Sequence, residues 1–454
     1  MTRDMTSGNP IRLILSFSLP LLVGNIFQQL YNMVDAMIVG KFVSTDALAA
    51  VGSTGAISFL ICGFAMGITS GFSVVMAQRF GADDLDGLRN AVAMAALLCG
   101  GLTVLLTALS TLLAKPLLLM MNTPSNIFAD AYAYIFMIFA GLAAPIFYNM
   151  LSGVLCALGD SRTPLLFLIV SSLLNVALDL LFILGLRMGV SGAAVATVIS
   201  QLASGGLCLL YMIRRFPVLH LHRKDWRLNR PLIIRHLKIG LPMAFQFSIT
   251  ALGVMALQGS INAFGSKAVA GYTAASKVEQ ICTQPMATFG VTMATYAGQN
   301  LGARRFDRIR EGVWKCSLLS VGVSAAVTGI VFLAGDWFVR LFVGGNEPEV
   351  MAYAREYMTV NSLFYAVLGL LFIFRNTLQG MGVSFIPMMA GVAELVMRTA
   401  VALTLPLLVG YIGVCVAGPA AWIGAAVPLI IAFFVLAPRL RRRYAAAEPD
   451  SASG

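Results

Sequence analysis

The chain has 454 residues, of which 59% are hydrophobic and only 11% are charged, whereas a soluble domain is about 45–50% apolar and about 25% charged. This composition excludes a soluble enzyme and a disordered chain, and the long apolar runs exclude an outer-membrane barrel, whose strands alternate over about 10 residues. The net charge of +11 does not indicate nucleic-acid binding, because excess Lys and Arg is typical of the cytoplasmic loops of membrane proteins. The sequence therefore predicts an all-α polytopic membrane protein.

Twelve apolar runs follow one another along the chain, and each is long enough for a membrane helix of about 20 residues. The first run, 13–39, exceeds the apolar core of a signal peptide, so we interpret it as a retained first helix. The other runs lie at 48–78, 90–114, 128–157, 163–185, 190–213, 234–260, 268–298, 312–335, 350–380, 385–408 and 412–437. They predict twelve transmembrane helices.

The basic residues are distributed unequally between the two sides of this arrangement. Most of them lie in the loops and ends on one side, above all in 214–238 and 439–443, whereas the other side has few. Because cytoplasmic loops carry the excess of Lys and Arg, we expect both termini in the cytoplasm and the protein in the plasma (inner) membrane. An even number of helices agrees with this orientation.

The two halves of the chain share five landmarks in the same order. They recur at a spacing of 221–223 residues and are Leu19-Pro20 with Leu241-Pro242, Gln78 to Ala82 with Gln299 to Ala303, Asp86 and Arg89 with Asp307 and Arg310, Gly159 to Pro164 with Gly382 to Pro387, and Gly189 and Gly192 with Gly410 and Gly413. Two copies of six helices predict two lobes related by a pseudo-two-fold axis along the membrane normal, with a cavity between them, as in transporters.

The longest polar stretch divides these halves. We predict an N-lobe of helices 1–6 at 1–213, a cytoplasmic linker at 214–233, a C-lobe of helices 7–12 at 234–437 and a cytoplasmic tail at 438–454.

Polar side chains inside the apolar runs are the strongest functional markers, because a charge within the bilayer costs roughly 2.5–3.5 kcal/mol. In the first helix Gln28, Asn32 and Asp35 share one face at i, i+4, i+7 spacing. In the fifth helix Asn175 and Asp179 are one turn apart. These spacings allow the side chains of each helix to face one site.

The sixth helix adds Thr197 among small residues, which permit close approach of helices. Two carboxylates, an amide and a hydroxyl form an all-oxygen set of the kind that hard cations such as Na⁺ prefer. The same carboxylates, desolvated and close together, could instead carry H⁺. The alternative is a structural role, in which Asp35 and Asp179 only form hydrogen bonds with neighbouring helices.

With these motifs the sequence resembles the bacterial branch of the multidrug and toxic compound extrusion (MATE) transporters over about residues 10–440. The matching features are Leu19-Pro20, Asp35, Gln78-x-x-Gly-Ala82, Gly159-Asp-Ser-Arg-Thr-Pro164, Asn175-x-x-x-Asp179 and Thr197. The resemblance implies an N-lobe cation or proton site made by Asp35, Asn175, Asp179 and Thr197. It also implies that Tyr134 lies near this site and that the first helix bends at Pro20 during transport.

The second half departs from this pattern. The position of Asp35 corresponds to about Leu257 and that of Asp179 to Ala402, and the seventh helix has Gln246 and Gln258 but no acidic residue. Some relatives carry a glutamate in that helix, so the resemblance does not extend to a cation site in the C-lobe.

Further polar residues are candidates for the substrate cavity. Glu394 and Arg398, at i and i+4, form either a self-neutralising pair or a charged cavity wall, and Lys277 and Glu279 line either the cavity or a helix interface. The complete set of cavity candidates is Gln28, Asn32, Asn149, Met150, Gln246, Lys277, Glu279, Glu394 and Arg398.

These features favour a secondary active multidrug efflux transporter, not an enzyme. We expect a monomer in the lipid bilayer that exports organic, cationic amphipathic drugs in exchange for Na⁺ or H⁺ by alternating access, with no cofactor and no metal other than Na⁺. The alternative is a flippase for a lipid-linked oligosaccharide or related lipid, whose anionic substrate would need cations such as Lys277, Arg375 and Arg398. A major-facilitator carrier is disfavoured because the 79–89 loop lacks its motif.

Overall fold

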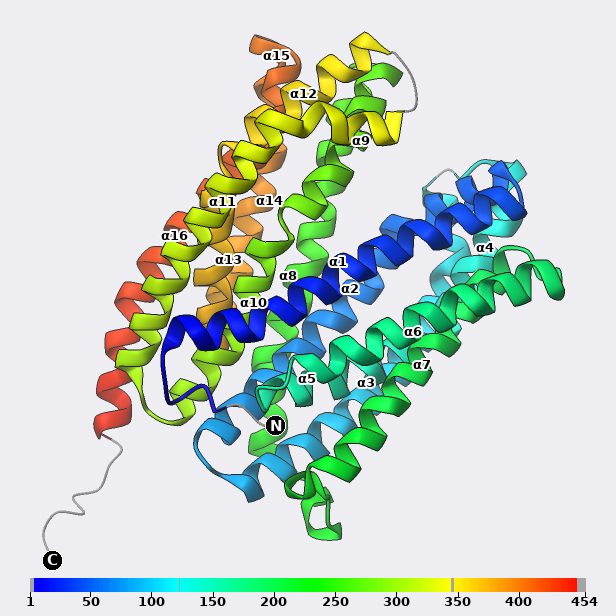
Figure 1. Cartoon of the computed structure of the whole chain (residues 1–454). Helices are drawn as coiled ribbons and strands as arrows, with labels where there is room; N and C mark the ends of the chain where they lie inside the picture. Colours follow the sequence, from blue (N-terminus) through cyan, green and yellow to red (C-terminus); the bar gives the residue numbers. More distant parts are fainter. Residues whose placement is uncertain (1–3, 122, 344–346, 447–454) are drawn as a thin grey trace, which may run out of the picture. The chain divides into compact units, whose positions relative to one another are not determined.

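The computed structural model describes residues 4–121, 123–343 and 347–446. Over these residues the regular structure is helical (Figure 1). By packing, the chain divides into two compact units, unit 1 comprising Leu19–Ser248 and unit 2 comprising Asp4–Ser18 and the chain from Ile249 onward. The all-α membrane fold predicted from the composition is thus confirmed.

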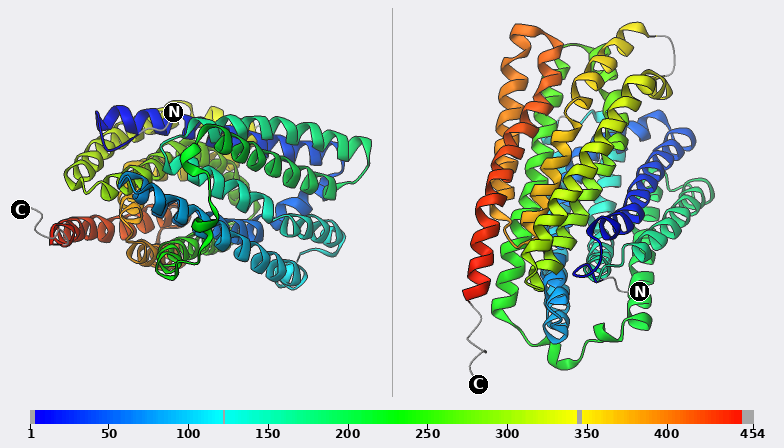
Figure 2. Two further views of the ribbon diagram at one scale, coloured as in Figure 1. Left: turned by 90° about the horizontal axis from the view of Figure 1, so that it is seen from below. Right: turned by 60° about the vertical axis from the view of Figure 1, so that its left-hand side comes forward.

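Unit 1 contains the helices of the first half. They are α2 (Thr45–Gly81), α3 (Leu85–Met120), α4 (Ser125–Ala140), α5 (Ala143–Ala157), α6 (Arg162–Leu180), the π-helical turn η1 (Leu181–Gly185), α7 (Val190–Arg215) and the short 3₁₀ turns η2 (Pro217–Leu219) and η3 (Arg223–Trp226). α6 and α7 lie side by side (Figures 1 and 2). The 3₁₀ turns occupy part of the predicted linker.

Unit 2 contains the helices of the second half. They are α9 (Ser266–Cys282), α10 (Gln284–Gly302), α11 (Phe306–Val343), α12 (Pro348–Ser362), α13 (Tyr365–Gly380), α14 (Phe385–Thr404), α15 (Pro406–Val409) and α16 (Tyr411–Ala446). α16 packs along α13 and α14 (Figure 2).

Two long helices belong to both units. α1 (Pro10–Phe42) passes from unit 2 to unit 1 between Ser18 and Leu19, next to Pro20, and α8 (Arg230–Asn262) passes from unit 1 to unit 2 after Ser248. The division by packing therefore differs from the chain-order boundaries predicted above. Residues 4–18 pack with unit 2 and residues 214–248 with unit 1, because the first turns of each repeat find their packing partners in the other half of the chain.

Within the described residues, nine helices are long and apolar enough to cross a membrane, and the bent pairs α4–α5 and α12–α13 bring the total to as many as eleven. The predicted helix at 268–298 is not among these candidate spans. It is divided at Thr283 into α9 and α10, and Pro285 in the first turn of α10 has no N–H to continue the preceding helix.

The repeat is visible in the backbone of the loops. Three pairs of residues at the repeat spacing share a positive φ, namely Asp83 (56°) with Arg304 (58°), Gly159 (84°) with Gly382 (82°), and Gly189 (59°) with Gly410 (68°). Positive φ is readily adopted only by glycine, so these glycines are required where the chain turns between helices.

Close packing in unit 1 depends on glycine in α2. A Cβ atom on Gly71 would lie 2.4 Å from Gly240 Cα, and one on Gly67 would lie 2.7 Å from Ala244 Cα. Small residues four apart on both helices let α2 and the first part of α8 approach at backbone contact. The sequence encodes this crossing through side-chain size.

Candidate functional site

Unit 1 encloses a cavity of about 390 Å³ among its helices. Seven of the predicted site residues line it, namely Gln28, Asn32, Asp35, Tyr134, Asn149, Asn175 and Thr197. They come from α1, α4, α5, α6 and α7. Helical spacing explains the convergence, because residues three, four and seven apart share a face and each helix turns its polar face to the same space.

The centre of this site is a pair of acids. Asp35 on α1 and Asp179 on α6 bring their carboxyl groups into hydrogen-bonding contact. Asp179 is 0% exposed, and one oxygen of each carboxyl group is buried with no hydrogen-bond partner. Two ionised carboxylates repel each other at this separation, so the contact requires a proton or a cation between them.

Asn175 connects this pair to α7. With its amide nitrogen facing the carboxylate, Asn175 donates a hydrogen bond to Asp179 Oδ2 at 3.2 Å, and its oxygen accepts one from the Thr197 backbone N–H at 3.2 Å. The Thr197 side chain also has a hydrogen bond with Tyr31. The amide therefore fixes the position of the carboxylate relative to α7.

Sequence reasoning missed a second polar stripe, on α7. Thr197, Ser200, Gln201 and Ser204 all line the cavity, and their i, i+3, i+4, i+7 spacing is the signal that could have identified them. Ser171 on α6 donates a hydrogen bond to the Ser200 carbonyl oxygen at 2.6 Å, which holds the two helices together beside the acids.

The helix that carries Asp179 changes its winding directly afterwards. The π-helical turn η1 begins at Leu181, and the Leu186 N–H donates to the Leu181 carbonyl oxygen at 3.0 Å. Such wide turns often occur at functional sites. Here the turn leads into the loop that ends at Gly189, and α7 begins at the next residue, Val190.

Other predicted cavity residues lie elsewhere. Met150 (8% exposed) belongs to the hydrophobic core of unit 1, and Gln246 is buried in α8 outside the cavity lining. Lys277 on α9 is exposed. Thus the structure groups only part of the predicted cavity set around the acids.

Glu394 and Arg398 belong to a buried charge cluster in unit 2. Glu394 accepts hydrogen bonds from Arg375 of α13 at 2.6 Å and from Arg398 at 2.8 Å, and all three side chains are less than a tenth exposed. The i, i+4 pair predicted from the sequence thus has a third partner. Because one carboxylate contacts two guanidinium groups, each arginine has an ion-pair partner, and the three side chains together keep a net charge of +1.

Glu279, which belongs to α9, lies near this cluster. Tyr357 donates a hydrogen bond to Glu279 Oε2 at 2.8 Å, whereas Oε1 is buried with no partner.

At the repeat spacing of 223, Glu394 and Arg398 take the positions of Ser171 and Asn175. The second repeat therefore has an ion pair where the first has a hydroxyl and an amide.

A transition-metal centre is not indicated by the described part of the chain, where no group of three or more His, Cys, Asp or Glu side chains could hold a metal ion. The oxygen atoms around Asp35 and Asp179 are the donors that fit an alkali cation or a proton.

Comparison with known proteins identifies the family. The model of the MatE family matches residues 20–181 and 242–404, one match in each repeat. The chain belongs to the MatE family. This confirms the resemblance noted above, and the chain is a multi-pass membrane protein of a family of multidrug efflux transporters.

Among its relatives, the probable multidrug resistance protein YpnP of Bacillus subtilis (strain 168) is 29% identical over 84% of each chain. The probable multidrug resistance protein NorM of Thermotoga maritima is 25% identical over 83% of this chain and 81% of the relative. A solved outward-facing multidrug resistance MATE transporter has the same fold, with a TM-score of 0.90 at 22% identity over 97% of this chain and 99% of that chain.

Proposed function

We propose that this protein is a secondary active transporter that exports organic cations in exchange for Na⁺ or H⁺. The observation that carries the proposal is the contact between Asp35, which lines a polar cavity of unit 1, and the buried Asp179. Relatives described as multidrug resistance proteins, and another described as a multidrug export protein, support an organic substrate.

Exchange follows from the charge of the acid pair. When Na⁺ or H⁺ occupies the pair, its negative charge is compensated and a second cation gains little by entering the cavity. When the ion leaves, the uncompensated carboxylates attract an organic cation, since a charge in a low-dielectric site is only weakly screened. The two ligands therefore bind alternately, and this competition couples the ion gradient to export.

Alternating access needs a segment that links this charge to movement. α1 carries Asp35 in unit 1, begins in unit 2 and contains Pro20 next to the boundary. Proline removes one backbone hydrogen bond of a helix and favours a kink there. Pro20 is thus the proposed hinge, and Gln28 and Asn32, between the hinge and the acid, line the same cavity.

A flippase for an anionic lipid-linked substrate is disfavoured because the arginines that it would need in unit 2 are already held in ion pairs. Arg375 and Arg398 are both held in ion pairs by Glu394, which compensates one of their two charges, and Lys277 is exposed. The only uncompensated charge in the described polar cavity of unit 1 is acidic, which favours a cationic substrate.

The distribution of the basic residues determines the orientation that we propose for the protein in the membrane. We place both termini in the cytoplasm of the plasma (inner) membrane and treat the monomer as the transporting unit, with Na⁺ or H⁺ as coupling ion and no cofactor. The drug leaves and the ion enters on the opposite side.

The test is efflux of a fluorescent organic cation from proteoliposomes under a Na⁺ gradient and a pH gradient imposed separately. Wild-type protein should respond to one of them, and this identifies the ion. Asp35→Asn should lower gradient-driven efflux to the level of protein-free vesicles, while Asp46→Asn, a change at an exposed acid of α2, should leave it unchanged. Full transport by Asp35→Asn would disprove the coupling role.

A further inference from the structure

Unit 2 has a larger cavity of its own, of about 1080 Å³, between α11, α13 and α16. It shares no lining residue with the cavity around Asp35. The volume lies slightly above the range of about 300–1,000 Å³ that is usual for small-molecule pockets. This cavity has room for a ligand with a long apolar part.

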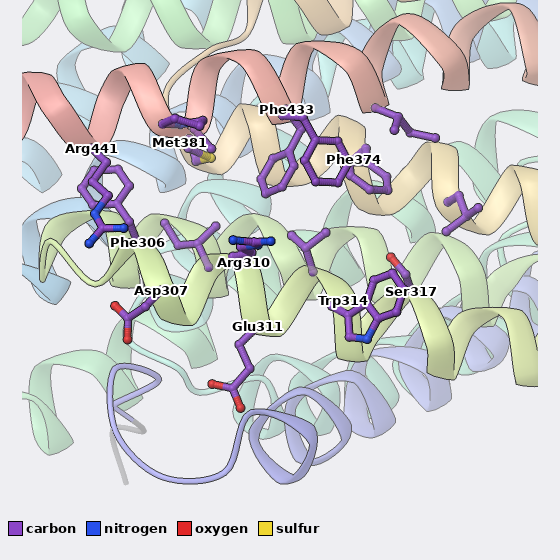
Figure 3. Close-up of a pocket in the computed structure, with 17 residues that line it drawn as sticks. Phe306, Asp307, Arg310, Glu311, Trp314, Ser317, Phe374, Met381, Phe433 and Arg441 are labelled. Atoms are coloured by element: carbon purple, nitrogen blue, oxygen red, sulfur yellow. The ribbon is translucent and has the colours of Figure 1, made fainter.

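The walls of this cavity are mainly apolar and include five aromatic residues (Figure 3). Phe374 and Phe433 pack with ring centroids 5.5 Å apart, and Trp314 and Phe434 line the same cavity while remaining 73% and 57% exposed. In a membrane helix, aromatic side chains exposed to this degree face lipid. The apolar part of a ligand would therefore meet lipid on one side and the rings on the other.

Two arginines of the cavity lining form no ion pair within the described part of the chain. Arg310 of α11 and Arg441 of α16 line it, and among the described residues neither forms a hydrogen bond or an ion pair. Figure 3 shows both side chains in the space between α11 and α16. Asp307 and Glu311 also belong to the lining, but their carboxyl groups extend from α11 on the side away from α16 (Figure 3). Of these acids, Glu311 is already bound by Lys315, with Nζ 2.5 Å from Oε1.

The surrounding sequence adds to the positive charge. Arg439, Arg442 and Arg443 flank Arg441 at the end of α16 with no acidic residue among them. This end of the helix belongs to the side that the excess of Lys and Arg assigns to the cytoplasm. Arginines that follow the cytoplasmic end of a membrane helix are attracted to anionic lipid headgroups.

We propose that this cavity binds an anionic phospholipid of the cytoplasmic leaflet, with its phosphate at Arg310 and Arg441 and an acyl chain along the aromatic wall. The chemistry selects against other occupants. An organic cation would be repelled by the two arginines, and a zwitterionic lipid has no net charge for them to attract. A guanidinium group also binds phosphate through two parallel hydrogen bonds, which favours a phosphodiester.

Trp314 serves as the reporter for this site. In a variant with Trp226→Phe, Trp337→Phe and Trp422→Phe it is the sole tryptophan, and bromine on an acyl chain quenches its fluorescence on contact. The full chain is reconstituted in phosphatidylcholine with a small fraction of brominated phosphatidylglycerol, or of brominated phosphatidylcholine at the same mole fraction. We expect phosphatidylglycerol to quench more strongly than phosphatidylcholine. The ratio of their association constants should rise by a factor of about five for each of the two arginines.

Matched variants separate a specific site from general surface charge. Arg310→Gln with Arg441→Gln should reduce the ratio to about one, whereas Arg214→Gln with Arg215→Gln, which removes two charges from the end of α7 in unit 1, should leave it unchanged. A second reporter that retains only Trp337, 59% exposed farther along α11, should show no preference. Unchanged thermal unfolding of each variant establishes that it is folded.

Equal quenching of Trp314 by the two lipids would overturn the proposal, and so would a preference that persists in the Arg310→Gln, Arg441→Gln variant. Neither result depends on transport, so the lipid site and the proposed efflux function fail independently.

Discussion

Asp35 of α1 and Asp179 of α6 hold their carboxyl groups in hydrogen-bonding contact within unit 1. The contact depends on Asn175, one turn before Asp179, which binds both the carboxylate and the backbone of α7. A single amide thus positions the acid on which the proposed exchange rests.

Replacing this amide should weaken both the fold and the transport. Asn175→Ala removes the hydrogen bond to a buried charged group, and this loss destabilises a protein by about 1–3 kcal/mol. We expect a lower unfolding temperature in detergent and clearly reduced gradient-driven efflux in proteoliposomes.

Asn149→Ala is the matched control, because Asn149 lines the same cavity but donates only to the Pro145 carbonyl oxygen of its own helix. It removes no hydrogen bond to the carboxyl pair, so the unfolding temperature should fall less than in Asn175→Ala. Equal losses of unfolding temperature in the two variants would contradict the positioning role of Asn175.

The buried cluster of unit 2 should be sensitive to the loss of its single shared anion. Glu394→Gln leaves Arg375 and Arg398 buried without the carboxylate that they share. Removal of one partner from a buried ion pair costs about 3–5 kcal/mol. Thermal unfolding in detergent should show a large decrease in stability.

Replacement of the whole cluster should have the opposite effect. A triple variant with Arg375→Met, Glu394→Leu and Arg398→Met should recover most of the lost stability, since apolar groups of similar size carry no desolvation cost. A stable Glu394→Gln protein, or a triple variant as unstable as Glu394→Gln, would contradict this account.

The crossing of α2 and α8 in unit 1 should not accept a methyl group. Gly71→Ala places Cβ 2.4 Å from Gly240 Cα, and overpacking against backbone typically costs about 1–3 kcal/mol. Gly100→Ala on α3 is the control, because no atom lies within 4 Å of its added Cβ and alanine is the better helix former. Measured unfolding temperatures should fall for the first variant and stay level or rise for the second.

The segment before α1 is anchored to unit 2 through a side chain of the repeat motif. Gln299 Oε1 accepts a hydrogen bond from the Met5 N–H at 2.8 Å, and Met5 is buried. Gln299→Leu removes this acceptor, and since one hydrogen bond contributes about 0.5–1.5 kcal/mol, hydrogen exchange at residues 4–9 should accelerate several-fold.

The repeat provides the control for this experiment. The equivalent residue Gln78 accepts a hydrogen bond from Arg235 at 2.5 Å in unit 1, so Gln78→Leu should leave exchange at residues 4–9 unchanged. If Gln299→Leu also leaves it unchanged, the anchor does not hold this segment.

Much of the architecture could be predicted because membrane helices are encoded locally. Apolar runs of about 20 residues mark the spans, and the repeated glycines mark the turns, as the matching φ angles of Gly159 and Gly382 show. The polar faces of the helices with Asp35, Asn175 and Thr197 were equally local, because helical spacing alone decides which residues share a face.

What tertiary structure decided was which faces meet. The sequence does not indicate where α1 and α8 pass from one unit to the other, since that depends on packing between segments of different repeats. It also could not reveal that Arg375 shares Glu394 with Arg398, or that Arg310 and Arg441 line one cavity and form no ion pair with any residue that the structure describes. Helical periodicity is a property of neighbours along the chain, whereas the compensation of a charge depends on residues brought together from distant helices.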